Sequence, residues 1–154
     1  MTPSGVDQGV QDILPYGTRF LFIKSVRLIN SSTAPRLEAL HNAQAGGGID
    51  TDHFRGVRIY PGAFILEGCA QAAVCLYNER VHRLNSTEVP LLAHSKARFV
   101  KAIHNATGLF HVVELVKAVG QNAIFRGTSK KNGTVIMECE LGLAVRSAQQ
   151  LNAQ

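Results

Sequence analysis

The sequence of 154 residues is long enough for one domain with a buried core and too short for two comfortable ones. Its apolar fraction of 45% and charged fraction of 18% exclude a disordered or fibrous chain. The net charge of +5 favours acidic partners, such as nucleic acid, an anionic carrier protein or a phosphorylated ligand, although a basic surface without a dedicated partner fits it equally. Because the sequence has no Lys/Arg-rich run, zinc finger or aromatic-basic motif, nucleic acid is the weakest of these candidates.

The sequence also indicates where the protein works. Its N-terminus lacks the basic start and apolar core of a signal peptide. The longest apolar stretch, residues 63–77, is interrupted by Glu67 and Gln71 and is too short to span a bilayer. We therefore expect a cytoplasmic protein.

The first third of the chain predicts one helix, two strands and a loop. Residues 6–14 predict a short amphipathic helix that ends before a proline. Residues 19–32 and 36–44 predict strands, since the first is rich in Phe, Ile and Val. Residues 45–52 contain three consecutive glycines and predict a flexible loop. At its end Asp50, Thr51 or Asp52 could cap a short turn that contains His53.

The main helix is predicted to start at Pro61-Gly62 and to reach about Leu84. Proline suits the start of a helix because its missing N–H would have no partner there. Between residues 63 and 76 the strongly polar side chains are Glu67 and Gln71, so this helix is buried on nearly all sides. A helix of this kind needs cover all round, which also suggests a partner subunit.

The rest of the chain predicts strands. Residues 91–103, 108–120 and 122–145 have strand character, and Asn132-Gly133 divides the last of them into a hairpin. The tail, about residues 146–154, is expected to be frayed. One long helix and five or six strands predict a single α+β domain over residues 1–154, with an antiparallel sheet wrapped around the helix.

Three cysteines, Cys69, Cys75 and Cys139, are not spaced as metal ligands are. Six residues separate the first two, so they would lie on different faces of a helix. We expect buried apolar thiols rather than a reactive nucleophile. Five of the histidines likewise lack the spacing of metal ligands, and they are His41, His82, His94, His104 and His111.

Glu67 and Gln71 are four residues apart and therefore share one face of the main helix. They could be a hydrogen-bonded polar pair that fixes the helix in its sheet. Alternatively, Glu67 is a carboxylic acid in an apolar surround, where desolvation raises its pKa and lets it donate a proton near neutral pH. The residues alone leave both readings open.

His53 alone is more often a surface or hydrogen-bonded core residue than a catalyst. Its place just before a helix start favours a catalytic role, because the N–H groups near Gly62 are free to hold a developing negative charge. His53 as base, Glu67 as acid and these donors form a coherent set for removing a proton next to a carbonyl.

The segment from His53 to Gln71 has the pattern H-F-x-x-x-x-I-x-P-G-x-x-I-x-E-x-x-A-Q. This pattern closely resembles HFPxHPIMPGxLIIEAMAQ, the active-site segment of the hot-dog-fold β-hydroxyacyl-acyl carrier protein dehydratases, without a gap. Weaker similarity covers most of the chain: ILPYGTRFLFIKSV resembles the family's LPHRYPFLLVDRV, and SKARFVKAI resembles its KLRFRQPV.

The resemblance implies a hot-dog fold and a dimer whose site lies at the subunit interface, with the histidine and the carboxylate from different subunits. It implies that His53 removes the α-proton of a 3-hydroxyacyl thioester and that Glu67 protonates the departing hydroxyl, directly or through water. The N–H of Gly62 would polarise the thioester carbonyl, and Gln71 would orient Glu67. The products would be a trans-2-enoyl thioester and water, with no cofactor and no metal.

The resemblance also implies an acidic acyl carrier protein as partner. Several positions depart from the family: Tyr60 stands where Met is usual, Phe64 where a smaller aliphatic residue is common, and Tyr16 where the LPH motif has His. We expect Tyr60 and Phe64 to line a reshaped acyl tunnel, for fatty-acid or for specialised intermediates such as those of polyketide or aryl-polyene synthesis. The candidate contacts to the carrier are Arg55, Arg58, Lys96, Arg98 and Lys101.

Two rival functions share the expected fold. A hot-dog thioesterase would use the helix carboxylate to activate water, and a non-catalytic subunit would bind the carrier or pair with an active, related subunit. The presence of both His53 and Glu67 at the dehydratase spacing favours the dehydratase.

Overall fold

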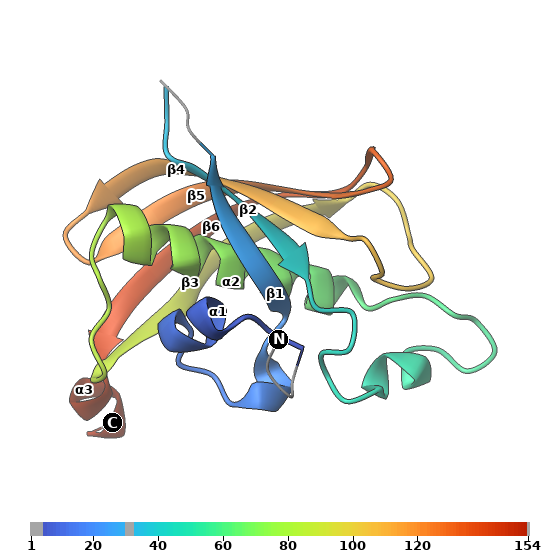
Figure 1. The fold of residues 1–154 in the computed structure, drawn as a ribbon, viewed down its shortest axis with the longest axis horizontal. Helices are drawn as coiled ribbons and strands as arrows, with labels where there is room; N and C mark the ends of the chain where they lie inside the picture. The colour runs from blue at the N-terminus through green and yellow to red at the C-terminus, as the bar shows by residue number, and fades with distance from the viewer. Residues whose placement is uncertain (1–4, 30–32, 154) are drawn as a thin grey trace.

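The computed structural model describes residues 5–29 and 33–153, in which one sheet wraps around a long helix (Figure 1). All neighbouring strands are antiparallel, in the order β1-β2-β4-β5-β6-β3. The α+β architecture predicted from the sequence is confirmed. The strands are β1 (Ile23–Ile29), β2 (Arg36–His41), β3 (Glu88–Phe99), β4 (Phe110–Val119), β5 (Asn122–Lys131) and β6 (Thr134–Ser147); the helices are α1 (Gln8–Ile13), α2 (Gly62–Arg80) and α3 (Ala148–Asn152), with 3₁₀ turns η1 (Thr18–Phe20) and η2 (Ile49–Asp52).

Helix α2 is the core of the molecule, as its composition predicted. Pro61 caps its N-terminus and Gly62 is its first residue. From Gly68 to Tyr77 every residue is buried, including the polar Gln71. The sheet therefore packs along most of the length of the helix.

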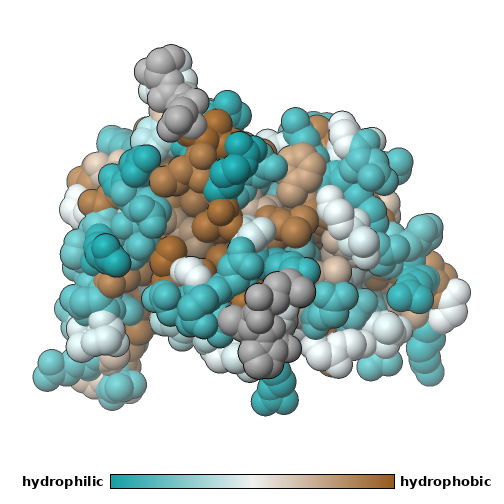
Figure 2. All heavy atoms as spheres, in the orientation of Figure 1, coloured by the Kyte–Doolittle hydropathy of each residue, from teal (hydrophilic) through white to brown (hydrophobic). Residues whose placement is uncertain are grey.

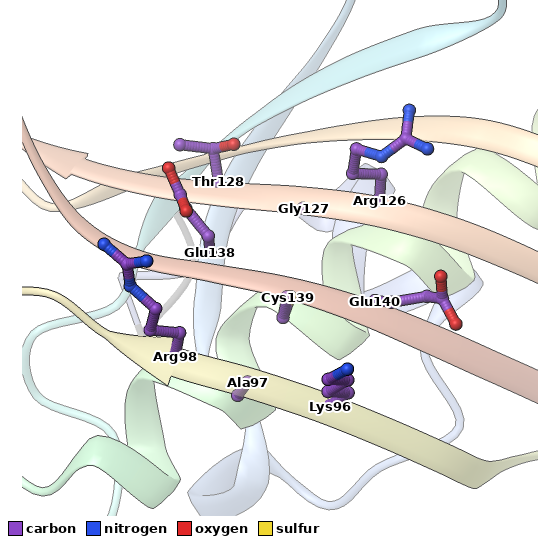
Figure 3. Close-up of a pocket in the computed structure, with 9 residues that line it drawn as sticks. All are labelled: Lys96, Ala97, Arg98, Arg126, Gly127, Thr128, Glu138, Cys139 and Glu140. Atoms are coloured by element: carbon purple, nitrogen blue, oxygen red, sulfur yellow. The ribbon is translucent and has the colours of Figure 1, made fainter.

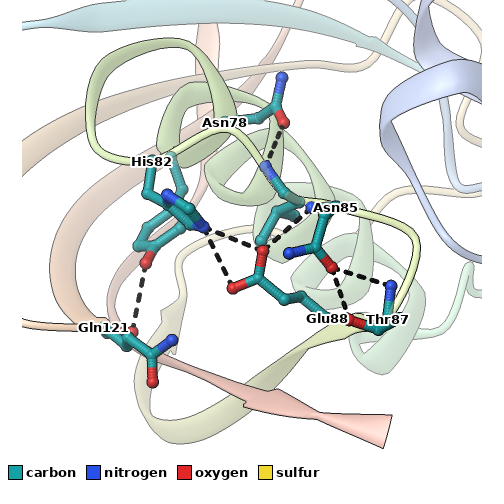
Figure 4. Close-up of polar contacts among 8 residues, drawn as sticks. Asn78, His82, Asn85, Thr87, Glu88 and Gln121 are labelled. Atoms are coloured by element: carbon teal, nitrogen blue, oxygen red, sulfur yellow. Dashed lines mark hydrogen bonds and ion pairs between the residues drawn. The ribbon is translucent and has the colours of Figure 1, made fainter.

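Helix α2 ends at Arg80, four residues before the predicted end. The N–H groups of Val81 and His82 both donate to the carbonyl of Tyr77, at 2.9 and 3.1 Å, which closes the last turn. The Asn78 side chain then accepts from the N–H of Leu84 at 3.0 Å and turns the chain towards β3 (Figure 4). Side-chain bonds of this kind compete with the helical ladder, and they end the helix early.

The first strand begins at Ile23, later than the predicted Arg19, because residues 18–20 form η1. The amide of Gln71 holds this turn: it donates to the carbonyl of Phe20 at 2.9 Å and accepts from the N–H of Phe22 at 2.9 Å. A buried side chain 49 residues away therefore decides where the strand starts. The predicted end of the strand, residues 30–32, lies outside the described residues.

The Asn132-Gly133 hairpin is confirmed, since both residues have positive φ angles, 51° and 74°, and join β5 to β6. The expectation of a frayed tail is wrong for residues 148–152, which form α3. The hydroxyl of Ser147 accepts from the N–H of Gln150, and the Gln150 side chain accepts from the N–H of Ser147. This reciprocal capping box stabilises a helix of only five residues.

The loop before α2 contains η2, and His53 follows it directly. The N-cap of η2 is Gly48, with φ 89°, rather than Asp50, Thr51 or Asp52, because the turn needs a left-handed residue there. Residues 53–61 then bring the chain to the same end of the molecule as the start of α2 (Figure 1).

Apolar atoms reach the surface around β1 and the adjoining part of α2 (Figure 2). Among the described residues, no helix is long and apolar enough to cross a membrane.

Candidate functional site

His53 is held in one tautomer by the backbone. Its Nδ1 lies 2.9 Å from the carbonyl oxygen of Ile59, an acceptor, so Nδ1 carries the proton. The lone pair is then on Nε2, the arrangement that a general base requires. The Phe54 ring lies against the imidazole, with 4.0 Å between the ring centroids.

His53 opens onto a hollow of about 360 Å³ at the start of α2. The hollow is lined by apolar side chains from the loop, from α2 and from the segment after β3, with few polar groups. An apolar hollow with a fixed base is suited to an acyl chain whose reacting carbon must lie near that base. Besides His53, its lining residues are Ile59, Tyr60, Gly62, Ile65, Phe99, Val100, Lys101, Ala102 and Ile103.

Gly62 brings the end of α2 into this hollow. It belongs to the first turn of the helix, whose N–H groups have no intrahelical acceptor and carry the positive end of the helix dipole. A Cβ added at Gly62 would lie 2.8 Å from the ring of Phe99. The absence of a side chain at Gly62 therefore lets the Phe99 ring pack directly against the helix start.

Glu67 and Gln71 form the predicted pair on α2. The Gln71 amide donates to Oε1 of Glu67 at 3.0 Å and to the Phe20 carbonyl at 2.9 Å, so the carboxyl group is tied to the chain through a fully buried glutamine. Burial raises the pKa of Glu67, and the hydrogen bond from Gln71 opposes this rise in part. The pair thus ties the helix to the chain near Phe20, and its carboxyl group is desolvated; the role of Glu67 as a proton donor stays a prediction.

Tyr16 is a phenol whose pKa depends in part on Glu67. The pKa of this phenol is raised to about 12, first by burial and then by the carboxylate of Glu67. Tyr16 is therefore a neutral hydroxyl beside the acid. From the sequence, this residue was notable only for its departure from the LPH motif.

His53 and Glu67 occupy different parts of one chain. Glu67 lies outside the residues that line the His53 hollow, on the part of α2 that faces η1. A second hollow, of about 680 Å³, adjoins η1 and is lined in part by Phe20 and Ile49, whose side chains are exposed. The two side chains therefore do not line one common hollow within this chain.

The FabA-like domain family matches residues 14–140 of this sequence, a span that includes His53, Gly62, Glu67 and Gln71. The chain belongs to the FabA-like domain family. It is 30% identical over 138 residues to the 3-hydroxyacyl-acyl-carrier-protein dehydratase FabZ of Pectobacterium atrosepticum, which covers 89% of this chain and 90% of that protein. It is also 30% identical over 137 residues to the FabZ dehydratase of Campylobacter curvus, covering 86% and 91%. The family expected from the His53–Gln71 segment is confirmed.

Solved structures confirm the hot-dog fold of this FabA-like chain. The dehydratase heterocomplex ApeI:P from Xenorhabdus doucetiae superposes with a TM-score of 0.64 at 18% identity, over 94% of this chain and 95% of that one. A putative thioesterase, yhdA from Lactococcus lactis, superposes with a TM-score of 0.63 at 12% identity, over 82% and 94%. At such low identity these structures establish the fold alone.

The two aromatic residues that depart from the family pattern lie together at the inner wall of the site. The Phe64 ring packs between Tyr60 and Phe22, with centroid distances of 5.8 and 5.0 Å. Tyr60 lines the His53 hollow, whereas Phe64 supports it from behind. Gly46 makes room for Phe64, since an added Cβ would lie 2.9 Å from that ring.

The five basic residues suggested for carrier binding lie on two faces of the protein. Lys101 lines the His53 hollow, and Arg55 and Arg58 are exposed in the loop that leads to it. Lys96 and Arg98 instead project from β3 into a hollow on the sheet, beside Arg126, Glu138 and Glu140 (Figure 3). The sequence placed all five together because it could not show which residues of β3 face the loop.

Two residues that the sequence interpretation set aside lie next to the site. His41 and His111 are buried and hydrogen-bonded to each other, and His41 also contacts the hydroxyl of Tyr60 at 2.8 Å. They are 70 residues apart in sequence, so no local pattern could reveal the pair. Across the described ranges, no group of three or more His, Cys, Asp or Glu side chains could hold a metal ion.

Proposed function

We propose that this protein is a 3-hydroxyacyl-acyl carrier protein dehydratase, which eliminates water from a carrier-bound 3-hydroxyacyl thioester to give the trans-2-enoyl thioester. The observation that supports this most is His53, whose Nδ1–H donates to the Ile59 carbonyl and leaves the lone pair on Nε2, in a hollow that Gly62 also lines. The identity to named dehydratases over most of the chain agrees with it.

The reaction follows from the chemistry of these groups. Nε2 of His53 takes the proton from the α-carbon, and negative charge develops on the thioester oxygen, where the Gly62 N–H donates a hydrogen bond. The electron pair of the broken C–H bond forms the C=C bond as the bond from the β-carbon to oxygen breaks. The leaving hydroxyl takes the proton of Glu67 and departs as water. Proton exchange with solvent then restores neutral His53 and protonated Glu67.

The complete site is proposed to form between two subunits. Phe54, Val57, Phe99 and Val100 expose apolar surface around the His53 hollow, and β3 is an edge strand of the sheet. Exposed apolar side chains next to an unpaired strand edge are suited to a symmetric contact with a second copy. Such a dimer would bring Glu67 of one subunit to His53 of the other; a related subunit could take the same place in a heterodimer.

The carrier is proposed to dock beside the hollow through Arg55, Arg58 and Lys101, and not through Lys96 and Arg98. Tyr60, which lines the hollow with Phe64 packed behind it, is proposed to favour specialised acyl chains, such as polyketide or aryl-polyene intermediates, over simple saturated ones. A series of carrier-bound 3-hydroxyacyl substrates, saturated and polyunsaturated, tests this preference by their relative kcat/KM.

The reaction is tested by mass spectrometry of the carrier species. Purified protein and a 3-hydroxyacyl carrier should give loss of one water, abolished in His53→Ala and Glu67→Gln. Free carrier as the main product would instead identify a thioesterase. Unchanged substrate that stays bound to the protein would identify a binding subunit.

The shared site has a sharper test. His53→Ala and Glu67→Gln proteins are each expected to be inactive, but after unfolding and refolding together half of the dimers should be mixed, each with one intact site. About a quarter of wild-type activity should then return, as random pairing in a two-fold dimer requires. No recovery in mixtures that native mass spectrometry shows to contain the mixed dimer would contradict a site built from two subunits.

A further inference from the structure

A buried hydrogen-bonded chain crosses the core beside the site. The hydroxyl of Tyr60 lies 2.8 Å from Nε2 of His41, and Nδ1 of His41 lies 2.9 Å from Nε2 of His111. Nδ1 of His111 lies 2.7 Å from the hydroxyl of Ser129. All four residues are at most 3% exposed. We call Tyr60, His41, His111 and Ser129 the buried polar chain.

The hydrogen bonds of the buried polar chain all run in one donor-to-acceptor direction, from Tyr60 to Ser129. The buried hydroxyl of Tyr60 donates its proton to its partner Nε2 of His41, and this direction carries along the chain to Ser129, whose oxygen accepts from Nδ1–H of His111. A neutral imidazole has one donor and one acceptor, so Nε2 of His111 accepts from Nδ1–H of His41. Each imidazole then has one donor and one acceptor, and the reverse direction would leave the Tyr60 proton without an acceptor among the described residues.

Gly68 of α2 makes space for the chain. A Cβ added there would lie 2.4 Å from Nδ1 of His41 and 2.6 Å from Nε2 of His111, closer than van der Waals contact permits. The bond between the two imidazoles therefore passes directly against the backbone of the helix. Helix and histidines fix each other's position at this point.

The buried polar chain ends at Tyr60, which belongs to the backbone segment that holds His53 in place. Tyr60 follows Ile59, whose carbonyl accepts the Nδ1 proton of His53, and precedes Pro61 and Gly62 at the start of α2. The backbone N–H of Tyr60 also donates to Ile103 at 2.8 Å. A change in the position of Tyr60 therefore moves the acceptor that sets the tautomer of His53.

We infer that Tyr60 and His41 are positioning residues for the base: the buried polar chain anchors the 59–62 segment and so keeps the His53 proton on Nδ1. This inference rests on the proposed dehydratase function for its effect on turnover, but not for its effect on the tautomer. Tyr60 departs from the family pattern. The hydroxyl that anchors the 59–62 segment therefore comes from a residue that this protein does not share with the family pattern.

A purely structural role for the chain would leave the tautomer of His53 unchanged. A matched pair of variants separates the two roles. Tyr60→Phe removes the hydroxyl from the buried polar chain. Tyr77→Phe also removes a buried phenol hydroxyl from the core, one that donates to the carbonyl of Gln121 at 3.4 Å, far along α2 from the site.

The readout is the pair of imidazole nitrogen resonances of His53 in histidine-labelled protein at pH 8, assigned by their loss in His53→Ala. Wild type and Tyr77→Phe should both show His53 with its proton on Nδ1. Tyr60→Phe should shift a substantial fraction to the Nε2–H form, with kcat about tenfold lower and KM within about twofold, since misplacing a base by a fraction of an ångström slows the chemical step.

Variants at His41 serve if Tyr60→Phe folds poorly. His41→Gln keeps an acceptor within reach of Tyr60 and should retain the Nδ1–H form, whereas His41→Leu should lose it. A His53 tautomer equal to wild type in folded Tyr60→Phe or His41→Leu would overturn the inference. Absence of dehydration by the wild-type protein would overturn the proposed reaction instead, and the tautomer comparison would still decide the inference.

Discussion

The carboxyl group of Glu67 has two requirements that conflict with each other. It must lie in an apolar surround to keep its proton, yet a buried carboxyl group needs hydrogen-bond partners. Gln71 meets the second demand because one amide donates to both Glu67 and the Phe20 carbonyl. The acid is therefore fixed without a salt bridge to any described cation, and such a cation would have lowered its pKa.

Glu67→Gln should remove activity and keep or increase stability. The variant has no proton to donate, so turnover should fall at least about a hundredfold, while the glutamine oxygen can still accept from Gln71. Because the folded pKa of Glu67 is raised, wild type binds this proton more tightly when folded and loses that stability as pH rises through the raised pKa. At pH 8 the free energy of unfolding of the variant should therefore equal or exceed that of wild type, as measured by urea denaturation.

Glu79→Gln is the control for this change, because Glu79 is an exposed residue on the same helix. It should leave turnover and the stability difference between pH 5 and pH 8 as in wild type. A Glu67→Gln protein that is less stable than wild type at pH 8 would show that the carboxylate is stabilised there, and it would argue against a desolvated acid.

At the scale of elements, local signals were readable and distant partners were not. Pro61-Gly62 and Asn132-Gly133 marked a helix start and a hairpin because proline and glycine restrict or extend φ by themselves. The capping box of Ser147 was equally local but was overlooked. The start of β1 was not predictable, since it depends on the Gln71 amide.

The same distinction holds for the candidate site. The resemblance over residues 53–71 supplied the base, the acid and their spacing in the sequence. It could not supply the buried polar chain, whose members come from β2, β4, β5 and the loop before α2. Nor could it separate Lys101 from Lys96, since the side of the sheet that each faces depends on strand register and on where β3 ends.

The packing of α2 on the sheet predicts an unfavourable effect of alanine at Gly68. Alanine improves helix propensity by about 1 kcal/mol relative to glycine. The added Cβ would overlap both His41 and His111, and overpacking costs about 1–3 kcal/mol before the loss of their hydrogen bond is counted. We expect the cost of this overlap to exceed the gain in helix propensity. Gly68→Ala should therefore lower the free energy of unfolding by about 2 kcal/mol or more, as measured by urea denaturation.

Gly9→Ala is the matched control, since Gly9 lies in α1 and no atom lies within 4 Å of its added Cβ. In Gly9→Ala only the helix propensity changes, so the free energy of unfolding should rise by up to about 1 kcal/mol. Equal effects of the two substitutions would mean that the helix does not press on the histidine pair.

For the whole molecule, the distribution of positive charge predicts how the carrier is recognised. Arg58→Glu and Lys101→Glu should each raise KM for the carrier-bound substrate severalfold at low salt, with kcat unchanged, because these residues lie beside the hollow. Lys96→Glu, on the sheet face of Figure 3, should leave KM near wild type. Salt should raise the wild-type KM and reduce the difference between variants. A KM effect of Lys96→Glu as large as that of Lys101→Glu would place the carrier on the sheet face.

The two buried histidines, His41 and His111, should make the free energy of unfolding depend on pH in the acid range. Burial lowers the pKa of His41 to about 3, and burial together with the neighbouring His41 lowers that of His111 well below its ordinary value. In the unfolded chain both protonate near pH 6.5. The unfolded state thus binds more protons below that pH, and the free energy of unfolding falls as pH falls.

The slope should approach about 1.4 kcal/mol per pH unit for each histidine between pH 6 and pH 4, where both are protonated in the unfolded chain and neutral in the folded one. Glu67 acts in the opposite sense over part of this range, so the comparison is made between variants. His41→Leu combined with His111→Met, apolar side chains of similar size, should remove most of the slope. His82→Gln, at an exposed histidine, should keep it. A wild-type slope that survives the double substitution would mean that other groups carry the acid sensitivity and that the histidine pair is not held neutral in the core.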